Sequence, residues 1–292
     1  KFINQLDKSL NIKNYADLHN WSIKHKNEFW TNVWDFTNFV GEKKGKIFKS
    51  APEFTKNKFF DECNINYAEN CLTREDDDDA IIFHSEKKIK RNYSWRELKS
   101  SVLKFANYLK NNNIEKNDRI AAILPNIPET VISFLSTAQL GAIWSSCSSD
   151  FGKKAIIDRF KQIEPKVLLF SDYYFYNNKK VDTTKIIKDV VYNIPSIEKI
   201  ILIPYEFNEK DYQLDFEYDN LCKILQQEIA YSKFEKFNFN HPLYILYSSG
   251  TTGVPKCIVH SSGGALIQHK KEHVLHCDTV SYTHLRAHET TP

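Results

Sequence analysis

The alternation of short apolar runs with longer amphipathic segments limits the fold of this chain more than any other feature. Four runs are typical of buried strands: Arg119–Leu124, Ala142–Ser145, Lys166–Phe170 and Lys199–Ile203. The segments between them repeat apolar residues every three or four positions, as helices do. Strands that alternate with helices of this length form a parallel sheet covered by helices. The sequence therefore predicts an α/β fold, with parallel sheet layers and flanking helices.

A capping box marks the start of one of these helices. In Ser94-Trp95-Arg96-Glu97 the serine hydroxyl can accept from the backbone three residues later, and the glutamate can reach back to the serine N–H. One helical face is then apolar: Leu98, Val102, Phe105, Ala106 and Leu109. We predict that this helix ends at Asn111–Asn113.

The chain divides into four regions by composition. Residues 1–70 are rich in aromatic side chains, and the spacing of those around Trp30 predicts helices. Residues 71–240 carry the α/β pattern, and residues 241–278 read as a strand, a loop, a second strand and a helix. Residues 279–292 resemble translated vector sequence and are treated as a non-native tail. Other expected elements are a hairpin of Ala80–His84 with Ile89–Tyr93, a helix from Pro125–Glu129 to near Gly141, and helices over Lys154–Gln162, 183–191 and Leu221–Tyr231.

The stretch Tyr247–Lys256 has the composition of a polyphosphate site. Small residues let backbone N–H groups converge on an anion, and hydroxyls add further donors. Lys256 adds a mobile positive charge suited to phosphate. The predicted phosphate-binding residues are Ser248, Ser249, Gly250, Thr251, Thr252, Gly253 and Lys256. The other interpretation is a flexible Ser/Gly turn that binds nothing.

The spacing of this stretch disfavours a Walker A site. That motif places lysine directly after its second glycine and then opens a helix. Here Val254 and Pro255 separate Gly253 from Lys256. Proline cannot occupy the interior of the helix that a Walker loop opens. The loop is therefore expected to bind phosphate in another way.

Two other clusters could hold a metal ion. The acidic run Glu75–Asp79 reads as a metal site or as a solvated loop, and acidic runs more often face water. The pattern His269-Lys270-Lys271-Glu272-His273 matches an inverted zinc-protease motif, but no distant third ligand is identifiable. We favour a solvated loop for the first and an ordinary helix for the second, and predict no protein metal site.

The charge pattern argues against a nucleic-acid-binding protein, and the cysteine pattern argues against a disulfide-bonded one. The 40 basic and 37 acidic residues are interspersed, which argues against a nucleic-acid partner. The 6 cysteines include no C-x-x-C pair, which fits a reduced, cytoplasmic protein. Residues 130–149 carry no charge but hold many serines, so we expect a buried helix and strand and no membrane span.

The loop and its flanks resemble the acyl-adenylate-forming superfamily, which includes acyl-CoA synthetases, luciferases and peptide-synthetase adenylation domains. With the flank Cys257–His260, the stretch is most similar to the acetoacetyl-CoA synthetase family. Gly141–Gly152, Asn66–Asn70 and Phe29–Phe36 agree with this resemblance. Ser149 departs from it, since that family usually has proline there. The resemblance covers roughly residues 20 to 278.

This resemblance implies the large N-terminal domain of such an enzyme and a two-step reaction. Acetoacetate and ATP, with Mg²⁺, would form an acyl-adenylate and pyrophosphate, and coenzyme A would then displace AMP. The predicted loop residues would hold the nucleotide phosphates, and Lys256 would also be catalytic.

In the family, the adenine and ribose motifs and a mobile C-terminal domain follow this loop, so we expect an N-terminal fragment that is inactive alone. Two alternatives stay open: a ligase for another short-chain acid, such as acetate or propionate, and a non-catalytic nucleotide-binding protein.

Overall fold

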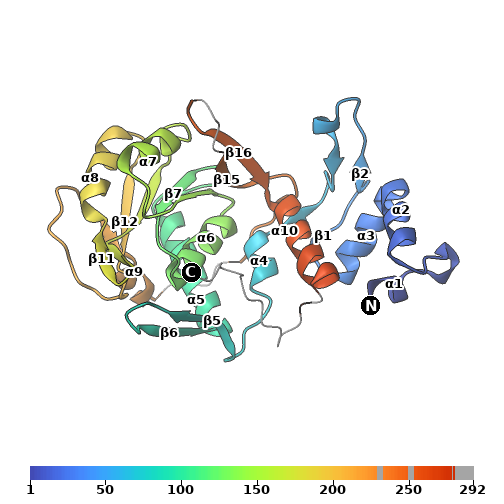
Figure 1. The fold of residues 1–292 in the computed structure, drawn as a ribbon, viewed down its shortest axis with the longest axis horizontal. Coiled ribbons are helices and arrows are strands. Elements are labelled where there is room, and N and C mark those ends of the chain that lie inside the picture. Colours follow the sequence, from blue (N-terminus) through green and yellow to red (C-terminus); the bar gives the residue numbers. More distant parts are fainter. Residues whose placement is uncertain (229–232, 249–252, 278, 280–292) are drawn as a thin grey trace. The chain divides into compact units, whose positions relative to one another are not determined.

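A computed structural model of the chain describes residues 1–228, 233–248, 253–277 and 279 (Figure 1). The chain divides into two compact units. The first consists of Lys1–Asn64, Asn238–Asn240 and Gly263–Pro292, and the second of Ile65–Phe237 and His241–Ser262. Among the helices in the described ranges, none has both the length and the apolar character that crossing a bilayer requires.

The second unit is built on a seven-stranded sheet in the order β13-β12-β9-β7-β8-β15-β16 (Figure 1). Neighbouring strands pair in parallel except β15 and β16, which are antiparallel. The predicted α/β class is therefore confirmed. The strands are β7 (Arg119–Ile123), β8 (Ile143–Cys147), β9 (Val167–Ser171), β12 (Lys199–Ile203), β13 (Asp219–Asn220), β15 (Pro242–Ser248) and β16 (Lys256–Ser261).

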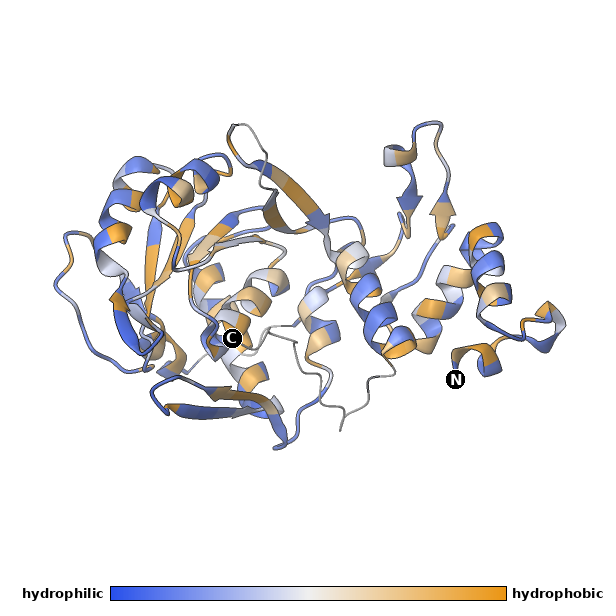
Figure 2. Ribbon diagram, viewed as in Figure 1, coloured by the Kyte–Doolittle hydropathy of each residue, from blue (hydrophilic) through white to orange (hydrophobic). Residues whose placement is uncertain are grey.

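Two helical layers cover this sheet, because alternate residues of each strand point to opposite faces. Ile120 and Ala122 of β7 belong to one buried cluster, and Ala121 and Ile123 belong to the other. Figure 2 shows the apolar residues running along these strands. The first cluster contains residues of α5 (Trp95–Asn111) and α9 (Leu221–Gln226), and α6 (Pro128–Gln139) packs on it through Phe134. The second cluster contains residues of α7 (Lys153–Phe160) and α8 (Thr184–Asn193).

The local signals read from the sequence give the helix ends closely. Ser94 caps α5 and forms the full capping box with Glu97. Asn66 caps α4 (Tyr67–Cys71) by accepting from the Glu69 N–H. The uncharged segment forms α6 and then β8, as expected for a buried helix and strand. The predicted hairpin is β5 (Asp79–His84) with β6 (Lys90–Ser94).

One predicted helix is too long, and one hairpin was missed. We expected a helix over Leu221–Tyr231, but α9 ends at Gln226 and Gln227 is extended. Leu221 and Ile224 pack in the core, whereas Gln226, Gln227 and Glu228 are polar and exposed, so these three residues bury no apolar face. The missed hairpin pairs β10 (Tyr173–Tyr176) with β11 (Lys179–Asp182).

The first unit is held together by aromatic side chains. The Trp34 ring stacks on Phe39 at 4.1 Å and on Phe60 at 5.1 Å between ring centroids, and Phe60 also contacts Phe239 at 4.6 Å. The predicted helix around Trp30 is α3. The remaining elements of the chain are α1 (Phe2–Gln5), η1 (Lys8–Leu10), α2 (Tyr15–Lys24), α3 (Lys26–Phe36), β1 (Gly41–Glu42), β2 (Phe48–Lys49), η2 (Phe54–Lys56), β3 (Lys58–Phe59), β4 (Asn64–Ile65), β14 (Phe237–Asn238), α10 (Ser262–Lys270) and the π-helix η3 (Lys271–His276).

Candidate functional site

The predicted phosphate loop joins the two strands of a β-hairpin. Ser248 ends β15 and Lys256 begins β16, and these two residues face each other as the last register pair before the loop. The hairpin therefore brings the first and last of the predicted phosphate-binding residues together. The predicted residues Ser249, Gly250, Thr251 and Thr252 lie outside the described residues.

The loop lies at the edge of the sheet where ligands of α/β proteins usually bind. β15 runs parallel to β8, which runs parallel to β7 and thus to β9 and β12. Ser248, the last residue of β15, therefore lies at the carboxyl ends of the parallel strands. Ligands in open α/β sheets bind outside these ends. The position of the loop, and not only its composition, thus favours a binding role.

The described end of the loop has the geometry that its residue types suggest. Gly253 has a φ of +102°, which a side chain would make unfavourable. Lys256 is exposed, and no ion pair to it is formed by the residues that the structure describes. Its ammonium group is therefore available for an anion, as a phosphate-binding lysine must be.

The start of the loop is fixed by Tyr247. Its side chain packs in the buried cluster that contains α7. The Tyr247 hydroxyl accepts a hydrogen bond from Ser145 of β8 at 3.1 Å and donates one to the Arg159 carbonyl of α7 at 3.3 Å. Burial of the ring raises the pKa of the Tyr247 phenol, so it stays a neutral donor. The loop therefore starts from a rigid base.

The structure agrees with the exclusion of a Walker A site. A Walker loop is followed by a helix, whose N-terminus binds the phosphates. In this chain the residues from Lys256 to Ser261 form a strand, and α10 begins only at Ser262. Phosphate binding here would depend on loop N–H groups, hydroxyls and Lys256, without help from a helix dipole.

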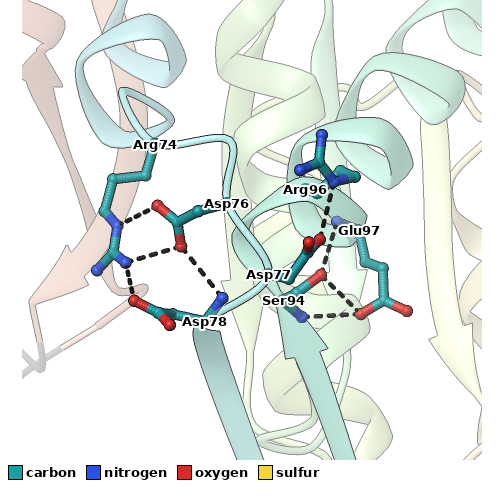
Figure 3. Close-up of polar contacts among 7 residues, drawn as sticks. All are labelled: Arg74, Asp76, Asp77, Asp78, Ser94, Arg96 and Glu97. Carbon is teal, nitrogen blue, oxygen red and sulfur yellow. Dashed lines mark hydrogen bonds and ion pairs between the residues drawn. The ribbon is translucent and has the colours of Figure 1, made fainter.

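The acidic run is a solvated loop tied down by basic neighbours (Figure 3). The Arg74 guanidinium donates to Asp76 at 2.7 Å and also bonds Asp78. Arg96 pairs with Asp77 at 2.8 Å. The hydrogen bonds from Arg74 lower the pKa of the Asp76 carboxyl. Each of these acids is thus paired with protein cations, and the described residues contain no group of three or more His, Cys, Asp or Glu that could hold a metal ion.

The His269–His273 pattern does not form a metal-binding cluster among the described residues either. On a regular α-helix His269 and His273 would share one face. His269 lies in the last turn of α10, but His273 lies in the π-helix η3, whose wider turn changes the spacing of its side chains. Both side chains are exposed, and Lys271 contacts His276 at 2.9 Å.

The first unit contains a cavity of about 680 Å³ that the sequence did not predict. Apolar side chains such as Leu18 and Trp30 line it together with basic ones such as Lys13 and Lys271. Of the predicted phosphate-binding residues that the structure describes, Ser248, Gly253 and Lys256 are not among those that line it.

A buried ion pair in the second unit was also missed. Glu129 is 0% exposed at the start of α6, and Arg91 of β6 donates to both of its carboxylate oxygens, with one bond of 3.0 Å. The Tyr93 hydroxyl donates to the same carboxylate at 2.8 Å. Burial raises the pKa of Glu129, and Arg91 and Tyr93 oppose this shift. Only the apolar surroundings of residue 129 in the sequence hinted at a buried charge.

Comparison with known proteins places this arrangement in a family. A family model described as "AMP-binding enzyme" matches residues 68–287, which is more than half of the chain. The chain belongs to this family. The seven-stranded sheet and the loop after β15 are thus features of an AMP-binding enzyme.

Several relatives of this AMP-binding enzyme are acetoacetyl-CoA synthetases. The acetoacetyl-coenzyme A synthetase of Rhizobium meliloti (strain 1021) is 40% identical over 265 residues, which cover 90% of the chain and 40% of the relative. The acetoacetyl-CoA synthetase of Xenopus tropicalis is 37% identical over 302 residues, covering 96% of the chain and 44% of the relative. The predicted resemblance is therefore confirmed.

A solved structure supports the fold of this AMP-binding enzyme. The acetoacetyl-CoA synthetase from Streptomyces lividans superimposes with a TM-score of 0.84 at 33% identity, covering 92% of this chain and 41% of that one. The chain spans less than half the length of these relatives.

Proposed function

We propose that this AMP-binding enzyme, in its complete form, is an acid–thiol ligase that converts acetoacetate, ATP and coenzyme A into acetoacetyl-CoA, AMP and pyrophosphate. The observation that carries the proposal is the loop between Ser248 and Lys256, set at the carboxyl edge of the sheet in a chain whose relatives are acetoacetyl-CoA synthetases. Such a loop suits the polyphosphate of a nucleotide.

The first step joins the acid to the nucleotide. A carboxylate oxygen of acetoacetate attacks the α-phosphorus of ATP, and the bond to the β-phosphate breaks, which releases pyrophosphate. This attack requires no general base, because a carboxylic acid with a pKa of about 4 is already ionised at neutral pH. The protein must instead align the reactants and stabilise the negative charge of the leaving group.

The residues of the phosphate loop would stabilise that charge. We assign binding of the β- and γ-phosphates to Ser248, Ser249, Gly250, Thr251, Thr252, Gly253 and Lys256. The exposed ammonium of Lys256 would follow the pyrophosphate as it leaves, which makes Lys256 the catalytic residue of this chain. The nucleotide enters as MgATP, and we assign no magnesium ligand to the chain.

The second step transfers the acyl group. The thiol of coenzyme A loses its proton and attacks the carbonyl carbon of the acyl-adenylate, which breaks the bond to AMP and forms the thioester. We assign no residue of this chain to that step. The phosphate loop contributes to it only through the acyl-adenylate that the first step forms.

The test is made on the protein expressed from the complete reading frame. We expect pyrophosphate exchange into ATP that depends on acetoacetate, and thioester formation when coenzyme A is added. A panel of acetate, propionate and longer acids tests the alternative of another short-chain ligase, which would give faster exchange with one of these acids. A non-catalytic protein would bind MgATP and give no exchange with any acid, which would contradict the proposal.

A further inference from the structure

The far end of the phosphate loop is held by a glutamine that follows α7. The Gln162 carboxamide nitrogen donates to the Pro255 carbonyl at 3.0 Å and to the Asp158 carbonyl at 2.7 Å. Its carboxamide oxygen lies 3.7 Å from the Cys257 sulfur, within reach of the thiol as a donor. Gln162 thus contacts the residue before Lys256 and the residue after it.

These three contacts fix the orientation of the carboxamide. The amide nitrogen has two N–H donors, and each faces a carbonyl oxygen. A rotated amide would instead place its oxygen against the oxygens of Asp158 and Pro255, and acceptors repel one another. Only one orientation of the carboxamide makes all three contacts, so the Gln162 side chain is held in one direction although it lies at the surface.

The contact with Pro255 controls the backbone of Lys256. The Pro255 carbonyl and the Lys256 N–H belong to one planar peptide unit, so a hydrogen bond to the carbonyl also orients the start of Lys256. The proline ring fixes φ on the other side of this unit. With both sides restrained, the Lys256 side chain leaves the strand in a set direction.

The same helical segment therefore holds both ends of the loop. At the start, the Tyr247 hydroxyl donates to the carbonyl of Arg159, and at the end Gln162 donates to Pro255. Arg159 and Gln162 are one turn apart. The loop is thus tied once to α7 and once to the turn that follows it, next to the last register pair, Ser248 and Lys256.

We propose that Gln162 is a positioning residue for phosphate binding: it holds the exit of the loop on α7 so that Lys256 is aimed at the polyphosphate. This inference rests on the proposed function. Gln162 touches neither substrate nor nucleotide in this account, and it acts through Pro255 and Lys256. Its loss should affect the use of MgATP and leave the binding of the acid unchanged.

The experiment compares two variants with a matched control in the complete enzyme. Gln162→Leu removes both donors and the acceptor, and Gln162→Glu keeps the size and acceptor but faces two carbonyls with a carboxylate. Gln226→Leu is the control, because Gln226 is also an exposed glutamine at a helix end, bonded to Glu209 at 2.6 Å in the same unit. Pyrophosphate exchange gives kcat and KM for MgATP and for the acid, and a thermal scan gives the midpoint.

We expect both Gln162 variants to lower kcat/KM for MgATP by roughly 10-fold to 100-fold, as displacement of a catalytic group does. The KM for the acid and the thermal midpoint should match those of the wild type and of Gln226→Leu. If Gln162→Leu does not fold, Gln162→Glu carries the test.

Two results would overturn the inference. One is wild-type exchange in both Gln162 variants while Lys256→Ala is impaired, which would leave the proposed function standing. The other is an equal loss for MgATP and for the acid with a lower thermal midpoint, which would mean a merely structural role. Wild-type exchange in Lys256→Ala would instead contradict the role proposed for Lys256, and only the absence of exchange in the wild-type enzyme would contradict the proposed function itself.

Discussion

The centre of the large sheet and its β15–β16 hairpin are built from similar residues in different surroundings. All five residues of β9 are buried, with a helical layer on each face. In β16 the residues from Lys256 to Val259 are exposed, although Cys257-Ile258-Val259 is as apolar in sequence as the centre of β9. Ile258 is 45% exposed and Val259 is 57% exposed.

The place of each strand in the sheet explains the contrast. β9 lies between β12 and β7, whereas β16 is the last strand in the order and has one neighbour. An edge strand keeps unpaired backbone groups and apolar side chains that a central strand would bury. The centre therefore supplies stability, and the hairpin can carry functional groups at little cost in stability. The two properties should separate when residues of each region are changed.

Truncation of a central side chain gives the largest expected effect on stability. Phe170 of β9 is 0% exposed and packs against α7 and α8, so Phe170→Ala should lower the free energy of unfolding by about 3–5 kcal/mol. The matched change Ile258→Ala on β16 should cost less than about 1 kcal/mol, because that side chain already contacts water. Urea denaturation of the 292-residue chain measures both, and equal losses would refute the contrast.

The buried ion pair of Arg91 and Glu129 should also contribute more to stability than the exposed residues of the β15–β16 hairpin. Arg91→Met leaves the Glu129 carboxylate buried without its cation, which should cost about 3–5 kcal/mol of unfolding free energy. The double variant with Glu129→Gln should recover much of this loss, since no charge is then buried.

Acid should also rescue the single variant. Burial raises the pKa of Glu129, and removal of Arg91 raises it further. As pH falls through this raised pKa, the folded state takes up a proton that the unfolded state does not yet bind, so Arg91→Met should gain stability relative to the wild type. A loss of stability that stayed constant from pH 8 to pH 5 would contradict this account of the pair.

A smaller, pH-dependent effect is expected at the start of the hairpin. His241 is 7% exposed, and its Nε2 lies 2.7 Å from the Gly141 carbonyl, so the neutral ring donates this bond. Burial lowers the pKa of His241 below its usual value. Below pH about 6.5 the unfolded chain binds a proton that the folded chain does not. Each unit by which the pH decreases in this range should therefore lower the free energy of unfolding by up to about 1.4 kcal/mol.

The measurement is the unfolding free energy of the wild type and of His241→Gln from pH 7.5 to pH 5.5. The glutamine variant can still donate to Gly141 but cannot titrate, so its curve should lack this part of the slope. Identical slopes in the two proteins would show that His241 is not held neutral.

The elements that the sequence predicts well depend on neighbouring residues. The start of α5 follows from Ser94 and Glu97, which are three residues apart and bond each other. The strands of the core follow from continuous apolar runs, and the connection between β15 and β16 from its small and hydroxylated residues. In each case the pattern itself lies within a few consecutive residues, so it can be read directly even where the stabilising partner is distant.

The parts that the sequence did not reveal depend on partners far apart in the chain. Arg91 and Glu129 are separated by 38 positions, and Gln162 and Pro255 by 93. No periodicity links such residues before the strands are placed. The β10–β11 hairpin did carry a local signal, because Asn177 and Asn178 both adopt positive φ in its two-residue turn, and asparagine favours such turns.

The central claim is that Lys256 acts in the chemistry and not in the fold. Its most direct test is pyrophosphate exchange by Lys256→Ala in the complete enzyme, with Lys188→Ala, an exposed lysine of α8, as control. We predict that Lys256→Ala lowers exchange by roughly 100-fold to 1,000-fold, as loss of a charge-stabilising donor does, with an unchanged thermal midpoint. Lys188→Ala should exchange like the wild type. Wild-type exchange by Lys256→Ala would contradict the account.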